Sequence, residues 1–138
     1  MQVLILDAQG GGVGRLLVEG LKRALPEQEL TVVGANALAT AAMLRAGAEH
    51  GATGENAAVV CAARADLILA PIGMVLCDAM LGEVTPAMAM AVGRSAAYKI
   101  LIPISRCQTS IAGLPSQTLP EAVDAAVREA VRRIAGRA

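Results

Sequence analysis

The sequence predicts an α/β fold, a three-layer Rossmann-like sandwich around a mostly parallel sheet of about five strands. Short apolar runs at residues 2–6, 30–33 and 67–70 lack polar alternation, as in parallel strands that are covered on both faces. Stretches with apolar residues at helical spacing separate these runs, and the first run leads into a glycine-rich turn. A length of 138 residues fits one domain spanning residues 1–138.

The first two predicted helices follow the first two strands. Residues 13–25 carry apolar side chains at helical spacing, and Pro26 ends this helix. The second helix, residues 37–46, begins after Asn36 as N-cap and consists almost entirely of Ala, Leu and Met. Because this helix has almost no polar face, we expect a subunit contact or a loop to cover it.

The middle of the chain allows two interpretations at residues 53–63. A short buried helix is our preference, and a strand at 58–61 is the alternative. We expect a loop or a short helix at 74–81. Thr85, followed by Pro, then caps another helix, and a strand at 99–103 comes after it.

The C-terminal part predicts an antiparallel edge hairpin and a long helix. Only a few residues separate the strand at 99–103 from a further predicted strand at 109–112, too few for a parallel crossover. The last strand is therefore expected to pair antiparallel at the sheet edge. Thr118 and Glu121 form a capping-box pattern that opens the most regular helix of the chain.

Composition argues against several function classes. Lys plus Arg is 12 and Asp plus Glu is 12, so the chain lacks the basic charge that nucleic-acid binding needs. No apolar run approaches the ~18 residues of a membrane span, and no signal segment precedes the first strand. The 3 cysteines form no CxxC pair, and Cys77 has no His to activate it. We expect a cytoplasmic protein without a metal site or a disulfide framework.

The hydrophobic core must consist of small and aliphatic side chains. The chain is 55% hydrophobic, yet it contains 1 Tyr and neither Phe nor Trp. Such side chains each bury little area, and chains of this kind often gain stability by association. We therefore expect a homodimer or a higher homo-oligomer.

Ligands of such folds bind beyond the carboxyl ends of the parallel strands. Four stretches fall at these ends, namely residues 7–14, 34–36, 71–73 and 105–107. Because parallel strands end at the same edge of the sheet, we expect these separated stretches to line one cleft.

The glycine turn at residues 10–14 presents backbone amides at the start of a helix, which favours an anion. It differs from the dinucleotide pattern G-x-G-x-x-G, and Ala8 occupies the first glycine position of the short-chain dehydrogenase turn. Arg15 and Leu16 stand where an ATPase turn has its Lys and its hydroxyl residue, so phosphoryl transfer lacks two of its parts. Two interpretations stay open: the turn binds the phosphate of a nucleotide or dinucleotide, or it only lets the helix pack closely.

A dinucleotide site also needs an acidic residue at the end of the second strand, where it holds the ribose hydroxyls. That strand ends in residues 33–36, which contain no Asp, no Glu and no Arg. Asn36 is a weaker substitute for the acid. The expected cofactor class is NAD(P) or another nucleotide, and NAD(H) itself is less well supported.

Other polar residues extend the predicted cleft. Asn36 and Thr40, one helical turn apart, either face the ligand or act as an N-cap and a hydroxyl bonded back to the Asn36 carbonyl. Glu55 and Asn56 either reach a substrate or ribose, or belong to a capped loop. Glu55 can act as a general base in such a position, and His50 is the other weak catalytic candidate.

The chain resembles an uncharacterised bacterial family of small proteins that is catalogued only as a domain of unknown function. The resemblance covers nearly the whole chain and rests on five segments, at residues 9–14, 36–40, 51–56, 71–73 and 82–86. The family carries Gly at the position of Ala8 and often Lys at that of Arg15, and the second difference keeps the charge. The resemblance implies no activity, substrate or cofactor.

We therefore expect a nucleotide, dinucleotide or other phosphate-bearing small molecule to bind at the glycine turn. The residues expected to line the cleft are Asp7, Gln9, Gly10, Gly11, Gly12, Gly14, Asn36, Thr40, Glu55, Asn56 and Gly73. The alternative is a non-enzymatic homo-oligomer whose glycine turn is purely structural. A third hypothesis is an enzyme acting on a small acid or a phosphorylated metabolite, with Glu55 or His50 as base.

Overall fold

The computed structural model describes residues 1–103 and 108–136. In these residues the elements are, in chain order, β1 (Val3–Asp7), α1 (Gly12–Ala24), β2 (Leu30–Gly34), α2 (Ala37–Arg45), β3 (His50–Thr53), α3 (Glu55–Arg64), β4 (Leu67–Pro71), the 3-10 helix η1 (Ile72–Val75), α4 (Pro86–Arg94), β5 (Tyr98–Ile102) and α5 (Leu119–Ala135).

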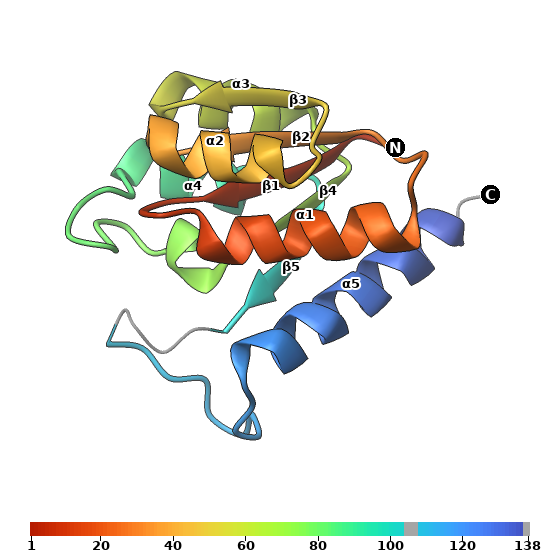
Figure 1. Ribbon diagram of the computed structural model, residues 1–138. Helices are drawn as coiled ribbons and strands as arrows, with labels where there is room; N and C mark the ends of the chain where they lie inside the picture. The colour runs from red at the N-terminus through yellow and green to blue at the C-terminus, as the bar shows by residue number, and fades with distance from the viewer. Residues whose placement is uncertain (104–107, 137–138) are drawn as a thin grey trace.

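A five-stranded parallel sheet in the order β3-β2-β1-β4-β5 forms the middle layer (Figure 1). This is the strand order of the first five strands of a Rossmann sheet. β1 and β4 are buried along their whole length, which explains why their sequences read as uninterrupted apolar runs. Asp7 pairs with Gly34, and Gly34 pairs with Thr53, so β1, β2 and β3 end at the same edge.

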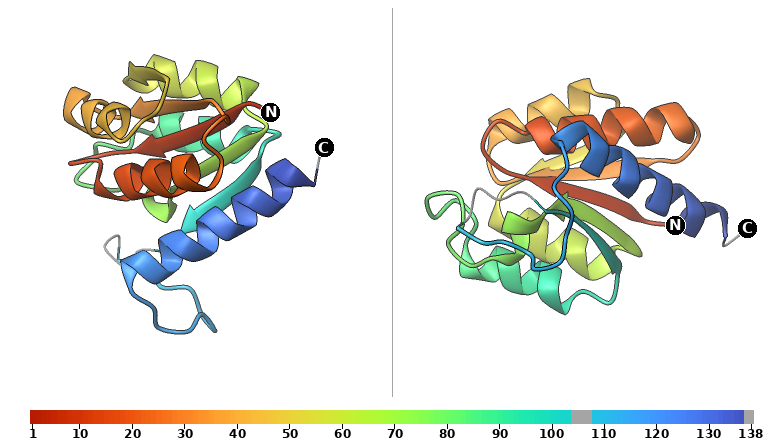
Figure 2. Two further views of the ribbon diagram at one scale, coloured as in Figure 1. Left: turned by 45° about the vertical axis from the view of Figure 1, so that its right-hand side comes forward. Right: turned by 90° about the horizontal axis from the view of Figure 1, so that it is seen from below.

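Helices cover both faces of the sheet, with α1, α2 and α5 on one side and α3 and α4 on the other (Figure 2). Leu17, Leu21 and Met43 belong to the first core, and Ala58 and Met88 belong to the second. The predicted core of small and aliphatic side chains is therefore split in two by the sheet. In the described residues, no helix is both long enough and apolar enough to cross a membrane.

Several local predictions are confirmed. The helix preferred at residues 53–63 exists as α3, and the strand alternative at 58–61 is wrong. The helix is not buried as expected, because only Ala58 and Ala62 of α3 are buried. The Thr118 side chain accepts the Glu121 N–H at 3.3 Å, and the Glu121 carboxylate accepts the Thr118 N–H at 3.4 Å, which completes the capping box of α5.

The predicted antiparallel hairpin at the C-terminal edge is wrong. All five strands are parallel, β5 is the edge strand, and residues 109–112 form no strand. Ile111 is 45% exposed, so the apolar residue that suggested a strand has no partner surface there. The chain instead leads into α5, which returns across the sheet to pack beside α1 (Figure 1).

The strand β3 was not predicted, because its sequence His-Gly-Ala-Thr has neither an apolar run nor an alternating pattern. All four of its residues are exposed, although Leu44 of α2 lies against Gly51. His50, expected in a loop, is its first residue. The helix α2 is also less covered than expected, because Leu38 is 63% exposed.

Candidate functional site

The Asp7 carboxylate closes the back of the glycine turn. Asp7 is the last residue of β1 and only 3% exposed. Its Oδ1 accepts the Ala8 N–H at 2.8 Å, and its Oδ2 accepts the Gly14 N–H at 2.7 Å. The N-cap position of α1, Gly11, has no side chain to do this. Asp7 therefore supplies, from inside the protein, the negative charge that a helix N-terminus favours.

Burial raises the pKa of the Asp7 carboxyl above its ordinary value of 3.8. Hydrogen bonds from three backbone amides of the turn oppose this rise, and the nearby charge of Glu83 adds to it. Because burial outweighs the amides, ionised Asp7 carries a free-energy cost in the folded protein.

Two glycines of the turn are required by packing. Gly11 has a φ of 74°, and a Cβ built there would lie 2.9 Å from the Ala39 carbonyl oxygen. A Cβ on Gly14 would overlap the sulfur of Met43 and lie 3.0 Å from the Cβ of Asp7. These positions let α1 press against α2 and β1, so glycine is needed there whatever the turn binds.

Gly10 and Gly12 differ from these two glycines in their exposure and in the space around a Cβ. Both are exposed, neither has a positive φ, and a Cβ built at either position meets nothing within 4 Å. The Gly11 N–H donates to the Ala8 carbonyl at 3.0 Å, but within residues 1–103 and 108–136 the amides of Gly10 and Gly12 have no partner. Two backbone donors without a partner in the described residues therefore lie on exposed residues at the start of α1.

Glu83 ties the glycine turn to the end of β2. Its Oε1 accepts the Gln9 N–H at 2.6 Å and an Asn36 Nδ2 hydrogen at 2.8 Å. Asn36 Nδ2 also donates to the Gln9 carbonyl at 2.9 Å, while its Oδ1 accepts the Ala39 N–H as N-cap of α2. Three segments of the chain thus meet on one carboxylate oxygen.

Sequence reasoning missed Glu83 as a site residue. A usable signal was present, because the loop between β4 and α4 begins at the carboxyl end of a central strand and must lie at the ligand edge. Glu83 is an isolated carboxylate near the end of that loop, just before the Thr85 cap.

Thr40 lies behind this edge rather than on it. Its hydroxyl accepts the Gly34 N–H at 3.2 Å and contacts the Thr53 hydroxyl at 2.7 Å. It also lies 3.2 Å from the Asn36 carbonyl, which matches the back-bonding alternative, and Thr40 is only 6% exposed. This hydroxyl joins α2 to the ends of β2 and β3.

The other predicted site residues are spread along and across the sheet. Glu55 and Asn56 are exposed and open α3 directly after β3, which is separated from β1 by β2. Gly73 is buried in η1, after β4. His50 begins β3 at the opposite edge, with its Nε2 3.5 Å from Glu29, and therefore lies outside the cleft. Residues 105–107 lie outside the described residues.

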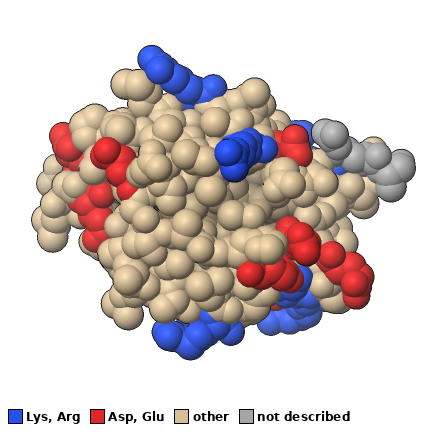
Figure 3. All heavy atoms as spheres, turned by 90° about the horizontal axis from the view of Figure 1, so that it is seen from above, with Lys and Arg blue, Asp and Glu red and all other residues tan. Residues whose placement is uncertain are grey.

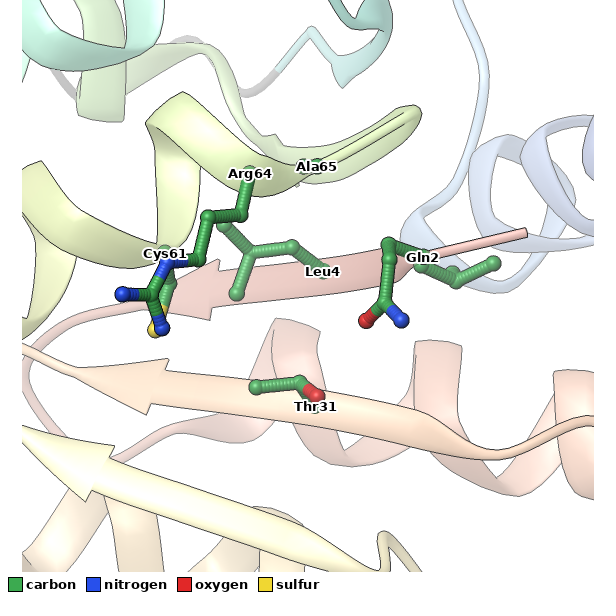
Figure 4. A pocket seen from close by; sticks show the side chains of 7 residues that line it. Gln2, Leu4, Thr31, Cys61, Arg64 and Ala65 are labelled. Carbon is green, nitrogen blue, oxygen red and sulfur yellow. The ribbon is translucent and has the colours of Figure 1, made fainter.

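A small cavity lies beneath α3, at the amino-terminal halves of β1 and β2 (Figure 4). Its volume is about 160 Å³, and its lining consists of Gln2, Val3, Leu4, Thr31, Cys61, Arg64 and Ala65. Ligand pockets for drug-sized molecules measure roughly 300–1,000 Å³. The cavity is too small for a nucleotide and lies far along the strands from the glycine turn.

The chain belongs to the family described as "Domain of unknown function (DUF3842)", whose profile matches residues 2–135. The chain is similar to a dodecameric FMN-dependent UbiX-like decarboxylase from Escherichia coli O157:H7, with 14% identity, a TM-score of 0.47, and coverage of 97% of this chain and 94% of that one. It is also similar to a protein from Aeromonas hydrophila subsp. hydrophila ATCC 7966 that is assigned to the short chain dehydrogenase/reductase family, with 14% identity, a TM-score of 0.45, and coverage of 99% and 75%. No curated protein matches the chain.

No group of three or more His, Cys, Asp or Glu that could hold a metal ion occurs in the described part of the chain.

Replacing Gly11 and Gly12 by alanine is expected to change the stability of the protein in different ways. Gly11→Ala is expected to lower the free energy of unfolding by about 1–3 kcal/mol, because the positive φ and the Ala39 backbone both oppose a side chain. Gly12→Ala is expected to change it little or raise it by up to ~1 kcal/mol, since the new methyl group lies in open space on a helix. Urea unfolding of both variants tests this, and equal losses would contradict the division.

The raised pKa of the Asp7 carboxyl is expected to make the stability of the protein depend on pH. Since its pKa is raised on folding, the folded protein binds this proton more tightly than the unfolded chain. The free energy of unfolding of wild type minus that of Asp7→Asn is expected to be greatest below pH 3.8 and to fall as pH rises through the folded pKa. Chemical denaturation at several pH values measures this difference, and one that rises with pH would reverse the assigned direction.

Proposed function

We propose that this member of the DUF3842 family binds a nucleotide or another phosphate-bearing small molecule at the carboxyl edge of β1 and β2. The proposal rests on the open surroundings of Gly10 and Gly12 and on their backbone amides, which are unpaired in the described residues. The fold gives no steric or conformational reason for glycine at either position, and their amides lack partners in the described residues. A ligand that approaches the backbone closely supplies that reason.

The phosphate would occupy a restricted place in front of α1. Asp7 already uses the Gly14 amide from behind, so the available donors are the outer amides of Gly10 and Gly12. The positive end of the helix dipole favours an anion there. Arg15, in the first turn of α1, is exposed, and its guanidinium is paired with Glu19 at 2.9 Å, one turn further along the helix.

The strand order supports the same location. The chain leaves β1 toward β2 on one side, and β4 flanks β1 on the other, so strand order reverses beside β1. Gln9 and Asn36 would line one side of a bound ligand and Gly73 the other. Glu55 and Asn56 would contact a more distant part, such as a base or a substrate.

Thermal-shift measurements test the proposal. We expect at least one of AMP, ATP, NAD⁺, NADP⁺ and FMN, at millimolar concentration, to raise the melting temperature. Gly12→Asp is expected to abolish this shift, because the new carboxylate would stand beside the amides that hold the phosphate. The variant is expected to fold, since nothing lies within 4 Å of a Cβ at this position.

Gly93→Asp is the matched control. Gly93 is an exposed glycine of α4 with open space around its Cβ, so the same charge is added away from the glycine turn. We expect this variant to keep the ligand-induced shift. No shift of the wild type with any of these ligands would contradict the proposal, and so would an undiminished shift of Gly12→Asp.

Self-association is a second candidate property, supported by the surface around α2, β3 and α3. Leu38, Leu44 and Val59 are exposed by 63%, 39% and 40%, and the outer side of the edge strand β3 pairs with nothing in the described residues. Figure 3 looks down on this side, where uncharged residues cover most of the face, one basic side chain lies near the centre, and other charged side chains lie toward the edges. Such a surface suits contact with a second copy of the chain.

Sedimentation velocity over a range of concentrations tests this second candidate. We expect a species larger than the monomer, and Leu38→Lys is expected to shift it toward the monomer by placing a charge in the apolar contact. Leu114→Lys, at a comparably apolar but distant exposed position, is the control and should sediment as the wild type does. A wild-type protein that is monomeric at all concentrations would contradict self-association.

A further inference from the structure

The Glu83 carboxylate lies at the end of β2, which has no acidic residue of its own. In dinucleotide sites an Asp or Glu that follows the second strand holds the ribose hydroxyls. Here residues 33–36 contain no acid, but the Glu83 carboxylate lies 2.8 Å from the Asn36 side chain and 2.6 Å from the Gln9 amide. The carboxylate therefore occupies the edge between β1 and β2, although it comes from the loop before α4.

Only one oxygen of this carboxylate is used within the protein. Oε1 accepts two hydrogen bonds, whereas Oε2 has no partner in the described residues. Glu83 is half-buried, and no unpartnered side-chain oxygen or nitrogen in the described residues is fully buried, so Oε2 reaches solvent. The Gly10 N–H, one residue beyond the Gln9 N–H that donates to Oε1, has no partner in the described residues. A free carboxylate oxygen beside a free N–H can accept from and donate to a single hydroxyl group.

The loop that delivers Glu83 adopts an unfavourable backbone conformation to do so. Asp78, Met80 and Leu81 have positive φ values of 65°, 57° and 60°, which non-glycine residues rarely adopt. The Asp78 N–H donates to the Val84 carbonyl at 2.8 Å, and the Val84 N–H donates to the Ala79 carbonyl at 3.2 Å. These bonds and the complete burial of Val84 hold the loop in this form. Such local cost is typical of segments whose conformation serves function.

We propose that Glu83 Oε2 accepts a hydrogen bond from the 2′-hydroxyl of the ligand's ribose, an inference that rests on the proposed nucleotide binding. The Asn36 amide and the Gln9 N–H fix the carboxylate in place, and the Gly10 N–H donates to the same hydroxyl oxygen. The phosphate then lies toward Gly12 and the sugar toward β2. The ligand class is a ribonucleotide with a free 2′-hydroxyl.

This arrangement also disfavours a 2′-phosphate. Such a group would face the negative charge of Glu83, with that of Asp7 behind it. No Arg follows β2, where one would neutralise a 2′-phosphate. The site therefore selects unmodified ribose over both deoxyribose, which lacks the donor, and 2′-phosphorylated ribose, which is repelled.

Matched ligands and one isosteric variant test this assignment. Affinities are measured by calorimetric titration for the four ribonucleoside 5′-monophosphates and their four 2′-deoxy counterparts, with inorganic phosphate as a further probe. We expect the wild type to bind the best ribonucleotide at least about tenfold more tightly than its deoxy counterpart, as is usual for a hydrogen bond to a charged group.

Glu83→Gln isolates the role of Oε2. The glutamine oxygen can still accept from Gln9 and Asn36, but an NH₂ group replaces the free acceptor. We expect ribonucleotide affinity to fall to the level of the deoxy counterpart, whose affinity stays within about twofold of wild type. Glu27→Gln removes the same charge from an exposed position away from the site and should keep the tenfold preference.

Three other results of these titrations would refute either the ribose contact alone or the ribose contact together with nucleotide binding. Equal affinity of the wild type for ribo- and deoxyribonucleotides would overturn the ribose contact and leave phosphate binding intact. Tighter binding of all probes, phosphate included, to Glu83→Gln would overturn it as well, because Glu83 would then act only as a repulsive carboxylate. If the wild type binds none of the monophosphates, the ribose contact fails. If, in addition, none of the nucleotides of the thermal-shift test raises the melting temperature, the proposed function fails with it.

Discussion

The buried Asp7 carboxylate and its hydrogen bond to the Gly14 amide set the geometry of the whole ligand edge. This bond joins the end of β1 to the first turn of α1, and it fixes the glycine turn between them. It also uses the helix N-terminus from the inside, so any anion outside must rely on the amides that remain free. Backbone donors offset only part of the cost of burying this carboxylate, because burial still raises its pKa.

A consequence of this constraint is that neighbouring residues of one short turn have separate roles. Gly11 and Gly14 are glycine because α2 and Met43 lie too close for a side chain, whereas Gly10 and Gly12 face open space. The two interpretations of the turn, structural and ligand-binding, are therefore not exclusive. Glu83 adds a polar acceptor at the β2 side of the same edge, so phosphate and sugar would occupy adjacent positions.

The sequence predicts the layers of the fold well, because buried parallel strands such as β1 leave long apolar runs and amphipathic helices leave a 3.6-residue period. It does not predict β3, whose exposed residues give no pattern, and it suggests a hairpin at 109–112 where exposed apolar residues imitate a strand. Within the site, Asp7 and Asn36 follow from strand ends. For Glu83 the end of β4 indicates only the edge of the sheet. Its approach to β2 depends on a loop conformation with several positive φ values that no local sequence pattern reveals.

The most direct test of the account is a residue-by-residue titration of backbone amide signals by NMR with a stabilising nucleotide. We expect the largest amide shifts at Gly10 and Gly12. Much smaller shifts are expected at Gly11 and Gly14, because their N–H groups already donate to the Ala8 carbonyl and the Asp7 carboxylate. Shifts that centre on the cavity beside Cys61 and leave the glycine turn unchanged would contradict it.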